Sequence, residues 1–335
     1  MPGDDAEIAD DPRAVHLRPG RRQVLQQALT GVVLASASLG LGRLLYRPAG
    51  SDVQAPAEGR QVRDFRVQER ALLPEVVVAK SSLDPEVLTR RAVTALGGMG
   101  RFISRGDIVA IKPNIGWDRT PAQAANTNPR VVAEVVRLCL EAGAHRVVVT
   151  DASCNEARRS FQRSGIWRAA HEAGAEVLLP AEHRFREMRI KGELLDRWPV
   201  YKPLIEADKL INVPIAKHHN LSSYTGAMKN WYGVLGGRRN RLHQNIHLSV
   251  ADLATFMRPT LTVLDATRVL LRNGPQGGNL ADARDLYQVV AGTDEIAIDT
   301  YGAGLIGVDA SRVGYLLLGQ ARGLGRMHSP HFLEV

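Results

Sequence analysis

Short apolar runs alternate with longer amphipathic segments along most of this 335-residue chain. The runs have the length of buried strands, and we predict strands at 76–79, 108–111, 146–150, 176–179, 210–213, 261–264 and 286–291. The segments between them repeat apolar residues at helical spacing, which predicts helices at 84–96, 128–142, 156–173, 245–256, 295–306 and 310–322. Repeated strand–helix units predict an α/β fold with a mainly parallel sheet and helices on both faces.

Residues 185–203 break this rhythm. Two extended segments, 186–190 and 194–200, flank the turn-forming residues Lys191-Gly192-Glu193. We therefore expect a β-hairpin insertion near 185–203, after which the sheet resumes.

Two helix starts carry strong local signals. Asp84-Pro85 and Asn128-Pro129 each place an N-cap side chain before a proline at the first helical position. Both helices are therefore expected to begin at these prolines.

The N-terminal segment resembles an export signal. Arg21-Arg22 precedes the uncharged run 28–41, which Arg43 follows and which is shorter than a membrane-spanning helix needs. With Ala55-Pro56-Ala57 as a cleavage site, this order predicts a twin-arginine signal over residues 1–57. The alternative is an amphipathic or buried N-terminal helix.

This interpretation sets the expected domain organisation and location. Residues 58–75 would be a linker, 76–324 a single α/β domain and 325–335 a C-terminal tail. The protein would be periplasmic, or anchored on the outer face of the inner membrane if the signal stays uncleaved. Its export partner would be the twin-arginine translocon, and membrane contact would involve the N-terminal segment alone.

Charge and cysteine content narrow the function classes. The net charge is +8, but the basic residues are scattered and aromatics make up 5%, which disfavours nucleic-acid binding and favours a basic pocket for an acidic small molecule. The two cysteines cannot hold a four-thiolate iron–sulfur cluster. Cys139 and Cys154 are expected at opposite edges of the sheet, too far apart for a disulfide.

Charged and polar residues follow the predicted strands. The carboxyl ends of parallel strands share one edge, where ligands of open α/β sheets bind. The residues expected there are Lys112 with Asn114, Asp151, Lys217 with His218 and His219, Asp265, and Asp294.

The richest stretch runs from Lys209 to Gly237. Pro214 ends an apolar strand, Lys217 to His219 follow in what reads as a loop, and Lys229-Asn230 lie in a short predicted helix. A buried lysine can act as a base, a Schiff-base former or an anion clamp. The candidate catalytic residues are Lys112, Lys217, Lys229, Asp151 and Asp265. For each residue alone, an ordinary cap or surface ion pair is the plainer explanation.

Other residues are candidates for ligand binding. Thr127-Asn128 begins a helix at the same edge, and helix N-termini attract anions. The loop 273–278 is rich in glycine, so its backbone can approach a ligand closely, but it matches no nucleotide-binding motif. The candidate ligand-binding set is Asn114, Thr127, Asn128, His218, Asn230, Gly274 and Gly278.

Histidines suggest a divalent metal. His243 and His247 are four residues apart at a helix start and could share one face. Together with His218 and His219 they would form a metal site. Helix capping and ordinary hydrogen bonding are the alternative roles.

Several of these residues together resemble the domain of unknown function 362 (DUF362) family, from about Val76 to Leu324. The carriers include Ile111-Lys112-Pro113-Asn114, Thr127-Asn128-Pro129, Val148 to Asp151, Ile211 to Pro214 with Lys217-His218, Thr225 to Asn230, His243 with His247, Asp265, Gly274-Pro275 with Gly278, and Thr293-Asp294. Members often follow a twin-arginine signal. Some carry ferredoxin-type cysteine clusters, which this chain lacks, so the resemblance implies no iron–sulfur cluster here.

The sequence is compatible with two functions. The first is an exported protein, possibly an enzyme, that binds an anionic small molecule or cofactor through the Lys/His/Asp cluster. The second is a non-catalytic metal- or cofactor-binding maturation factor for a periplasmic partner. The Lys/His-rich sheet edge is also loosely similar to that of lactate racemases with a nickel-pincer cofactor, but no sequence motif supports this similarity. The resemblance leaves the reaction and substrate unspecified.

Overall fold

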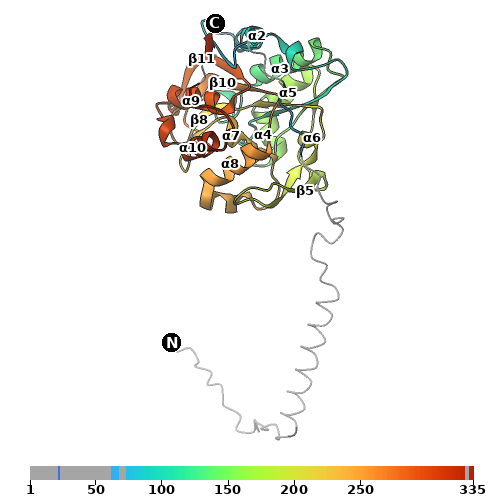
Figure 1. The fold of residues 1–335 in the computed structure, drawn as a ribbon, viewed down its shortest axis with the longest axis vertical. Coiled ribbons are helices and arrows are strands. Elements are labelled where there is room, and N and C mark those ends of the chain that lie inside the picture. The colour runs from blue at the N-terminus through green and yellow to red at the C-terminus, as the bar shows by residue number, and fades with distance from the viewer. Residues whose placement is uncertain (1–21, 23–61, 68–72, 329–331) are drawn as a thin grey trace, which may run out of the picture. The chain divides into compact units, whose positions relative to one another are not determined.

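The structure, a computed structural model, describes residue 22 and residues 62–67, 73–328 and 332–335 (Figure 1). Apart from Arg22, the predicted signal over residues 1–57 lies outside the described residues, and so do positions 58–61 and 68–72 of the predicted linker. In the part of the chain that is described, no helix is both long and apolar enough to cross a membrane.

A ten-stranded sheet organises the described residues from 73 onward. The strands β12, β1, β11, β10, β7, β2, β3 and β4 follow one another in that order, and β8 pairs with both β10 and β9. The bounds are β1 Val76–Ala79, β2 Ile108–Pro113, β3 Arg146–Val149, β4 Glu176–Val177, β7 Lys209–Val213, β8 Ile215–His219, β9 Ser223–Thr225, β10 Leu261–Leu270, β11 Ala283–Gly292 and β12 Phe332–Glu334.

The sheet is mainly parallel, as predicted. The strands β10, β7, β2, β3 and β4 are parallel to their neighbours in this series, and β1 is parallel to β12. The exceptions are β11, which is antiparallel to both β1 and β10, and the antiparallel pair β8–β9. Because β11 runs the other way, Asp294 follows it at the opposite edge of the sheet, and its predicted place beside Asp265 is wrong.

Helices cover both faces of the sheet (Figure 1). On one face Val77 and Val109 pack with apolar residues of α2 Pro85–Ala95, α3 Pro129–Glu141, α4 Ala157–Arg163 and α5 Ile166–Glu172. On the other face Val78 and Leu264 pack with residues of α7 Ala227–Asn230, α8 Ile246–Phe256, α9 Glu295–Leu305 and α10 Gly314–Ala321. Adjacent strand residues point to opposite faces, so the run Val76–Ala79 is buried on both sides.

The predicted hairpin forms a separate two-stranded sheet. Its strands are β5 Phe185–Arg189 and β6 Arg197–Tyr201, and α6 Lys202–Ile205 follows directly. The tryptophan Nε1 of Trp198 donates to the carbonyl of Gly236 at 2.9 Å, which ties the hairpin to the segment after α7.

Three predicted elements differ in detail. The helix expected over 156–173 is two helices, because Gly165 between them has a left-handed φ of 75°. The strand expected to end at Asp265 continues to Leu270, so Asp265 lies mid-strand. Lys217, His218 and His219 lie in β8, not in a loop.

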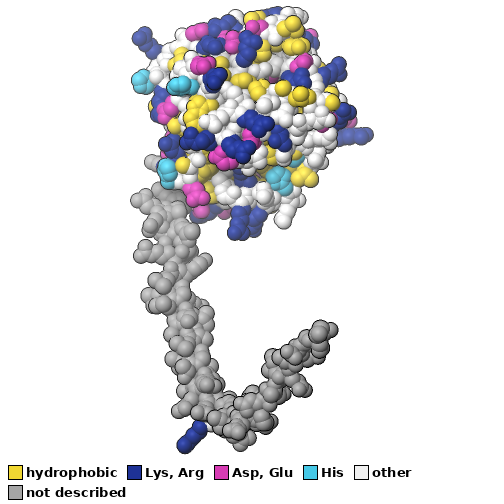
Figure 2. All heavy atoms as spheres, turned by 180° about the vertical axis from the view of Figure 1, so that it is seen from behind, with side chains coloured by type: hydrophobic (Ala, Val, Ile, Leu, Met, Phe, Trp, Pro, Cys, Tyr) yellow, Lys and Arg dark blue, Asp and Glu magenta, His cyan; other side chains and the backbone are white. Residues whose placement is uncertain are grey.

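Charges on the surface are mixed. In the view of Figure 2, lysine and arginine side chains are interspersed with acidic ones. On this face the positive net charge of the chain is therefore not gathered into one basic patch.

Candidate functional site

A buried ion pair lies where β2 and β3 end. Lys112 Nζ is 2.7 Å from Asp151 Oδ1, and both side chains are almost fully buried. The second oxygen of Asp151 accepts from the backbone N–H of Ile115 at 2.7 Å. Burial lowers the pKa of Lys112, and Asp151 opposes that effect. The pair places one cation and one anion in the interior, each with further polar contacts.

Two asparagines connect this pair to a second lysine. Asn230 Oδ1 accepts from Lys112 Nζ at 3.1 Å and from Asn114 Nδ2 at 3.0 Å. Asn114 Oδ1 in turn accepts from Lys217 Nζ at 3.0 Å, and Lys217 also donates to the carbonyl of Ala125 at 2.5 Å. Residues from β2, β8 and α7 therefore form one hydrogen-bonded cluster.

Lys217 and Lys229 differ from Lys112 because, among the described residues, neither forms an ion pair with a carboxylate. Burial lowers the pKa of Lys217 to about 7 and that of Lys229 to about 8. Lys229 Nζ lies 4.5 Å from the ring centroid of Tyr232, a cation–π contact. We call Lys112, Lys217, Lys229 and Asp151 the lysine cluster. With all three lysines protonated and Asp151 ionised, the cluster has three positive charges and one negative charge.

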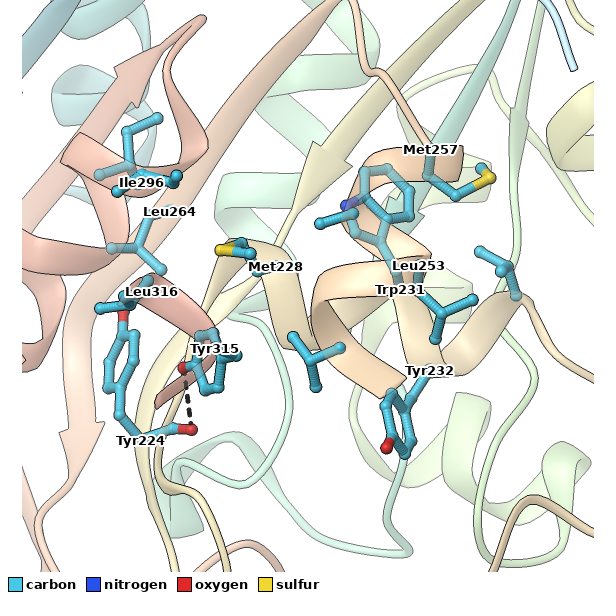
Figure 3. Close-up of a cluster of buried hydrophobic side chains, with 14 of the residues drawn as sticks. Tyr224, Met228, Trp231, Tyr232, Leu253, Met257, Leu264, Ile296, Tyr315 and Leu316 are labelled. Carbon is cyan, nitrogen blue, oxygen red and sulfur yellow. Dashed lines mark hydrogen bonds between the residues drawn. The ribbon is translucent and has the colours of Figure 1, made fainter. Parts of the chain in front are cut away.

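Buried carboxylates on α9 hold α7 in place. Asp299 accepts from the backbone N–H groups of Ala227 and Met228 at 2.5 and 3.0 Å. Glu295 accepts from Asn212 Nδ2 at 2.7 Å and from Trp231 Nε1 at 3.0 Å. Burial raises the pKa of Glu295 to about 7 and that of Asp299 to about 8. The side chains of Met228 and Trp231 enter the apolar cluster of Figure 3, which fixes the one-turn helix that presents Lys229.

The connection from α9 to the lysine cluster is continuous. Asn212 Oδ1 accepts from Asn230 Nδ2 at 2.8 Å, and Asn230 contacts Lys112. Sequence reasoning missed Glu295, Asp299 and Asn212. Asn212 gave a signal as an amide inside an otherwise apolar strand, and Asp299 gave one as a residue that, with Ala297, contributes to the resemblance to the DUF362 family.

Asp265 and the start of α3 form a neighbouring site. Asp265 Oδ2 accepts from the backbone N–H of Asn128 at 2.7 Å, and Asp265 Oδ1 accepts from Thr267 Oγ1 at 2.6 Å. Burial raises the pKa of Asp265, although hydrogen bonds from Thr267 oppose the shift. Thr127 Oγ1 donates to the carbonyl of Val213 at 2.7 Å. Both oxygens of Asp265 and the hydroxyl of Thr127 therefore have hydrogen-bond partners within the protein.

A cavity of about 180 Å³ opens beside Asp265. Pro85, Asn128 and Tyr287 contribute to its walls, and none of the three lysines lines it. The predicted residues therefore fall into two groups. Asp265 and Asn128 line this cavity, whereas Asn114 and Asn230 contact the lysine cluster.

Two histidines lie near Lys229. His219 Nδ1 accepts from the backbone N–H groups of Leu221 and Ser222, so the neutral ring carries its hydrogen on Nε2. Burial lowers the pKa of His219 to about 2, and the charge of Lys229 acts in the same direction. His243 stacks on His219 with ring centroids 6.3 Å apart. His219 is therefore a neutral donor.

The other two histidines have structural contacts elsewhere. His247 Nδ1 accepts from the N–H of Tyr315 at 3.2 Å, and the His247 ring stacks on Tyr315. His218 Nδ1 accepts from the N–H of Gly274 at 3.2 Å. Among the described residues no group of three His, Cys, Asp or Glu is arranged to hold a metal ion. The structure does not gather the four histidines predicted to form a metal site.

Glycines show where backbones approach closely. A Cβ added to Gly274 would lie 1.9 Å from the carbonyl oxygen of His218, so this glycine packs against β8. Gly278 has a left-handed φ of 144° near Arg119. Gly233, which the sequence did not single out for the site, passes beside the ion pair: its added Cβ would lie 1.9 Å from Asp151 Oδ1 and 2.6 Å from Lys112 Nζ.

The chain matches one protein-family model over the region that contains this site. The family model named Domain of unknown function (DUF362) matches residues 109–304, more than half of the chain. The chain belongs to the DUF362 family. The matched range contains every member of the lysine cluster and the two α9 carboxylates that support it.

Relatives of this DUF362 chain are distant. A protein of Synechocystis named as thylakoid-associated is 25% identical over 236 residues, which cover 67% of this chain and 70% of that protein. A Thermotoga maritima protein of known crystal structure is 12% identical with a TM-score of 0.38, over 72% of this chain and 60% of that one. The lactate racemase apoprotein from Thermoanaerobacterium thermosaccharolyticum is 13% identical with a TM-score of 0.37, over 70% of this chain and 56% of that one. The matches thus span less than two thirds of either solved structure.

Proposed function

We propose that this DUF362 chain binds a small organic anion at the lysine cluster. The observation that carries the proposal is that Lys217 and Lys229 are both buried and, within the described residues, neither has a carboxylate partner. Removing an unpaired ammonium group from water costs several kcal/mol of folding free energy. A bound anion would offset that cost by supplying the missing charge.

The surrounding groups favour an anion over a cation. His219 is neutral and carries its hydrogen on Nε2, and Arg239 lies close enough for its charge to lower the pKa of Lys229. Asp151, the one acid in the cluster, is committed to Lys112. Donors therefore outnumber free acceptors around the cluster.

Lys217 also has the means for chemistry. A neutral lysine amine has two N–H groups, and Asn114 Oδ1 and the carbonyl of Ala125 accept two hydrogen bonds from Lys217. The lone pair of the neutral form would then be free, and a pKa of about 7 makes this form abundant near neutral pH. Lys217 would act on the bound anion as a base or as an amine nucleophile toward a carbonyl group.

Isothermal titration calorimetry tests the binding site. We expect small carboxylates such as pyruvate, lactate and malate to bind, with affinity that falls as pH rises from 7 to 9, because Lys217 and Lys229 lose their protons in that range. Binding at pH 8 should take up protons, which appears as a dependence of the binding heat on the ionisation enthalpy of the buffer. A Lys229→Gln variant should bind about tenfold or more weakly.

Lys191→Gln is the matched control, since it removes the same charge from an exposed position of the hairpin. Equal affinities for Lys229→Gln and wild type, or binding without proton uptake at pH 8, would contradict the proposed site.

Residues 1–57 are proposed to direct export by the twin-arginine route to the periplasm. The support is the order of Arg21-Arg22, the apolar run and Ala55-Pro56-Ala57. Replacing Arg21 and Arg22 by lysine should leave the protein in the cytoplasmic fraction, whereas wild type is recovered in the periplasmic or membrane fraction. Unchanged fractionation of the double variant would exclude this route.

A further inference from the structure

Cys154 lies on the exposed side of the lysine cluster. It belongs to the loop between β3 and α4, where its backbone N–H donates to the carbonyl of Gly116 at 2.9 Å. Its side chain is free and exposed, whereas Cys139, a residue of α3, is free and buried in the core. One of the two thiols can therefore meet solutes, and the other cannot.

The position of Gly116 relates this thiol to the cluster. A Cβ added to Gly116 would lie 3.9 Å from Cys154 Sγ and 3.7 Å from Asn114 Oδ1. Asn114 Oδ1 is the atom that accepts from Lys217. The thiol and the asparagine that contacts Lys217 therefore both lie next to the position that a side chain at Gly116 would fill.

Electrostatic interactions also connect Cys154 to the three lysines of the cluster. A thiolate at Cys154 would attract the charges of Lys112, Lys217 and Lys229 and raise the pKa of each. Arg239 adds a cation on the same side, with one guanidinium nitrogen 2.7 Å from the carbonyl oxygen of Ser153, the residue before Cys154. The three lysines and Arg239 are therefore the cations nearest to this part of the loop that the contacts above identify.

Lys229 is the group that faces this region without a partner of its own. It is 7% exposed, and among the described residues its Nζ forms neither a hydrogen bond nor an ion pair, only the contact with the Tyr232 ring. An anion drawn to Lys229 is brought to the side of the cluster where Cys154 lies.

We propose that Cys154 is a nucleophile that covalently captures small organic anions bearing an electrophilic carbon. This inference rests on the proposed anion site. The thiol loses its proton to solvent, and the thiolate sulfur attacks the carbon. A sulfur–carbon bond forms while the bond from that carbon to the leaving group breaks, and the leaving group departs with the bonding electron pair. The carboxylate of the captured molecule stays paired with the lysine cluster.

The test compares two alkylating reagents of nearly equal size on the folded full-length chain. Iodoacetate carries the negative charge that the site should select, and iodoacetamide does not. Both transfer a two-carbon group to sulfur and release iodide. The rates at Cys154 are measured by peptide mass spectrometry at pH 7 and low salt, with N-acetylcysteine as the small-molecule reference, Cys154→Ser to confirm the assignment and buried Cys139 as the internal control.

We expect the iodoacetate-to-iodoacetamide rate ratio at Cys154 to exceed that of N-acetylcysteine by about tenfold or more, because a positive site concentrates anions near the sulfur. Added salt should reduce the excess. Lys229→Gln should remove most of it, and Lys191→Gln should leave it unchanged.

A ratio at Cys154 equal to that of N-acetylcysteine, or no reaction at Cys154, overturns the inference. Either result can coexist with carboxylate binding measured by calorimetry, in which case the anion site stands and the covalent role falls. If calorimetry detects no carboxylate binding and the iodoacetate-to-iodoacetamide rate ratio at Cys154 equals that of N-acetylcysteine, both proposals are wrong.

Discussion

An Asp151→Asn variant should unfold with a free energy about 3–5 kcal/mol below that of wild type. The substitution keeps the shape and leaves an amide oxygen that can still accept from the N–H of Ile115. It removes the carboxylate paired with Lys112, which has no other carboxylate partner in the part of the chain that is described. The Lys112 side chain is 0% exposed and cannot turn to water. The change is measured by urea denaturation at neutral pH, followed by circular dichroism.

A double variant separates the lost charge from lost packing. Lys112→Met with Asp151→Asn removes both charges and retains most of the buried volume, so it should recover most of the stability that Asp151→Asn alone loses. If the double variant is as unstable as the single one, the loss comes from packing or from other hydrogen bonds, and the explanation based on an unpaired buried ammonium is wrong.

A Gly233→Ala variant should lose about 2–4 kcal/mol, a large effect for one methyl group. The backbone at Gly233 is not in the left-handed region, so strain in φ plays no part. The loss would come from the new Cβ, 1.9 Å from Asp151 Oδ1, which would part the ion pair with Lys112. Urea denaturation measures the loss, and carboxylate binding should weaken in parallel because the cluster is displaced.

Gly304→Ala is the matched control for that experiment. Gly304 lies in α9, is exposed, and an added Cβ would contact nothing within 4 Å. Alanine should therefore stabilise the helix by about 0.5–1 kcal/mol. Similar destabilisation by both alanines would show that the contact at Gly233 is not the cause.

Local signals predicted the helix starts well. Asp84 accepts from the N–H groups of Glu86 and Val87, and Asn128 accepts from the N–H of Arg130, so both are N-caps and the helices begin at the prolines that follow. Capping depends on a few consecutive residues, and these residues can be read from the sequence alone. The hairpin over 185–203 was predicted for the same reason.

Strand direction could not be obtained in this way. The apolar run in β11 has the composition of a parallel core strand, but the strand is antiparallel to both neighbours. Which way a strand runs depends on the path of the whole chain, and the run itself has no marker for it. Asp294 was therefore placed at the wrong edge of the sheet.

The lysine cluster was anticipated because Lys112 and Asp151 follow buried strands that end at the same edge. The supports of the cluster were not anticipated, because Glu295 and Asp299 lie on a helix far along the chain, where acidic residues are ordinarily exposed. The contacts of the individual histidines could not be predicted for a related reason. Spacing indicates that His243 and His247 can share a helix face, but residues packed around them decide what each ring contacts, and His247 contacts Tyr315.

The lysine cluster joins parts of the chain that are far apart in sequence. The contact from Lys112 to Asn230 spans 118 positions, and the contact from Lys217 to Asn114 spans 103. Loops of that length close late in folding, since their entropy must be lost before the contact forms. While a ribosome is still making the segment after Asn230, the nascent chain lacks α9 and cannot hold α7 in place. An intact cluster therefore indicates that these distant segments have come together, and a ligand that needs it would distinguish the native protein from forms that lack α9 or have not yet made these contacts.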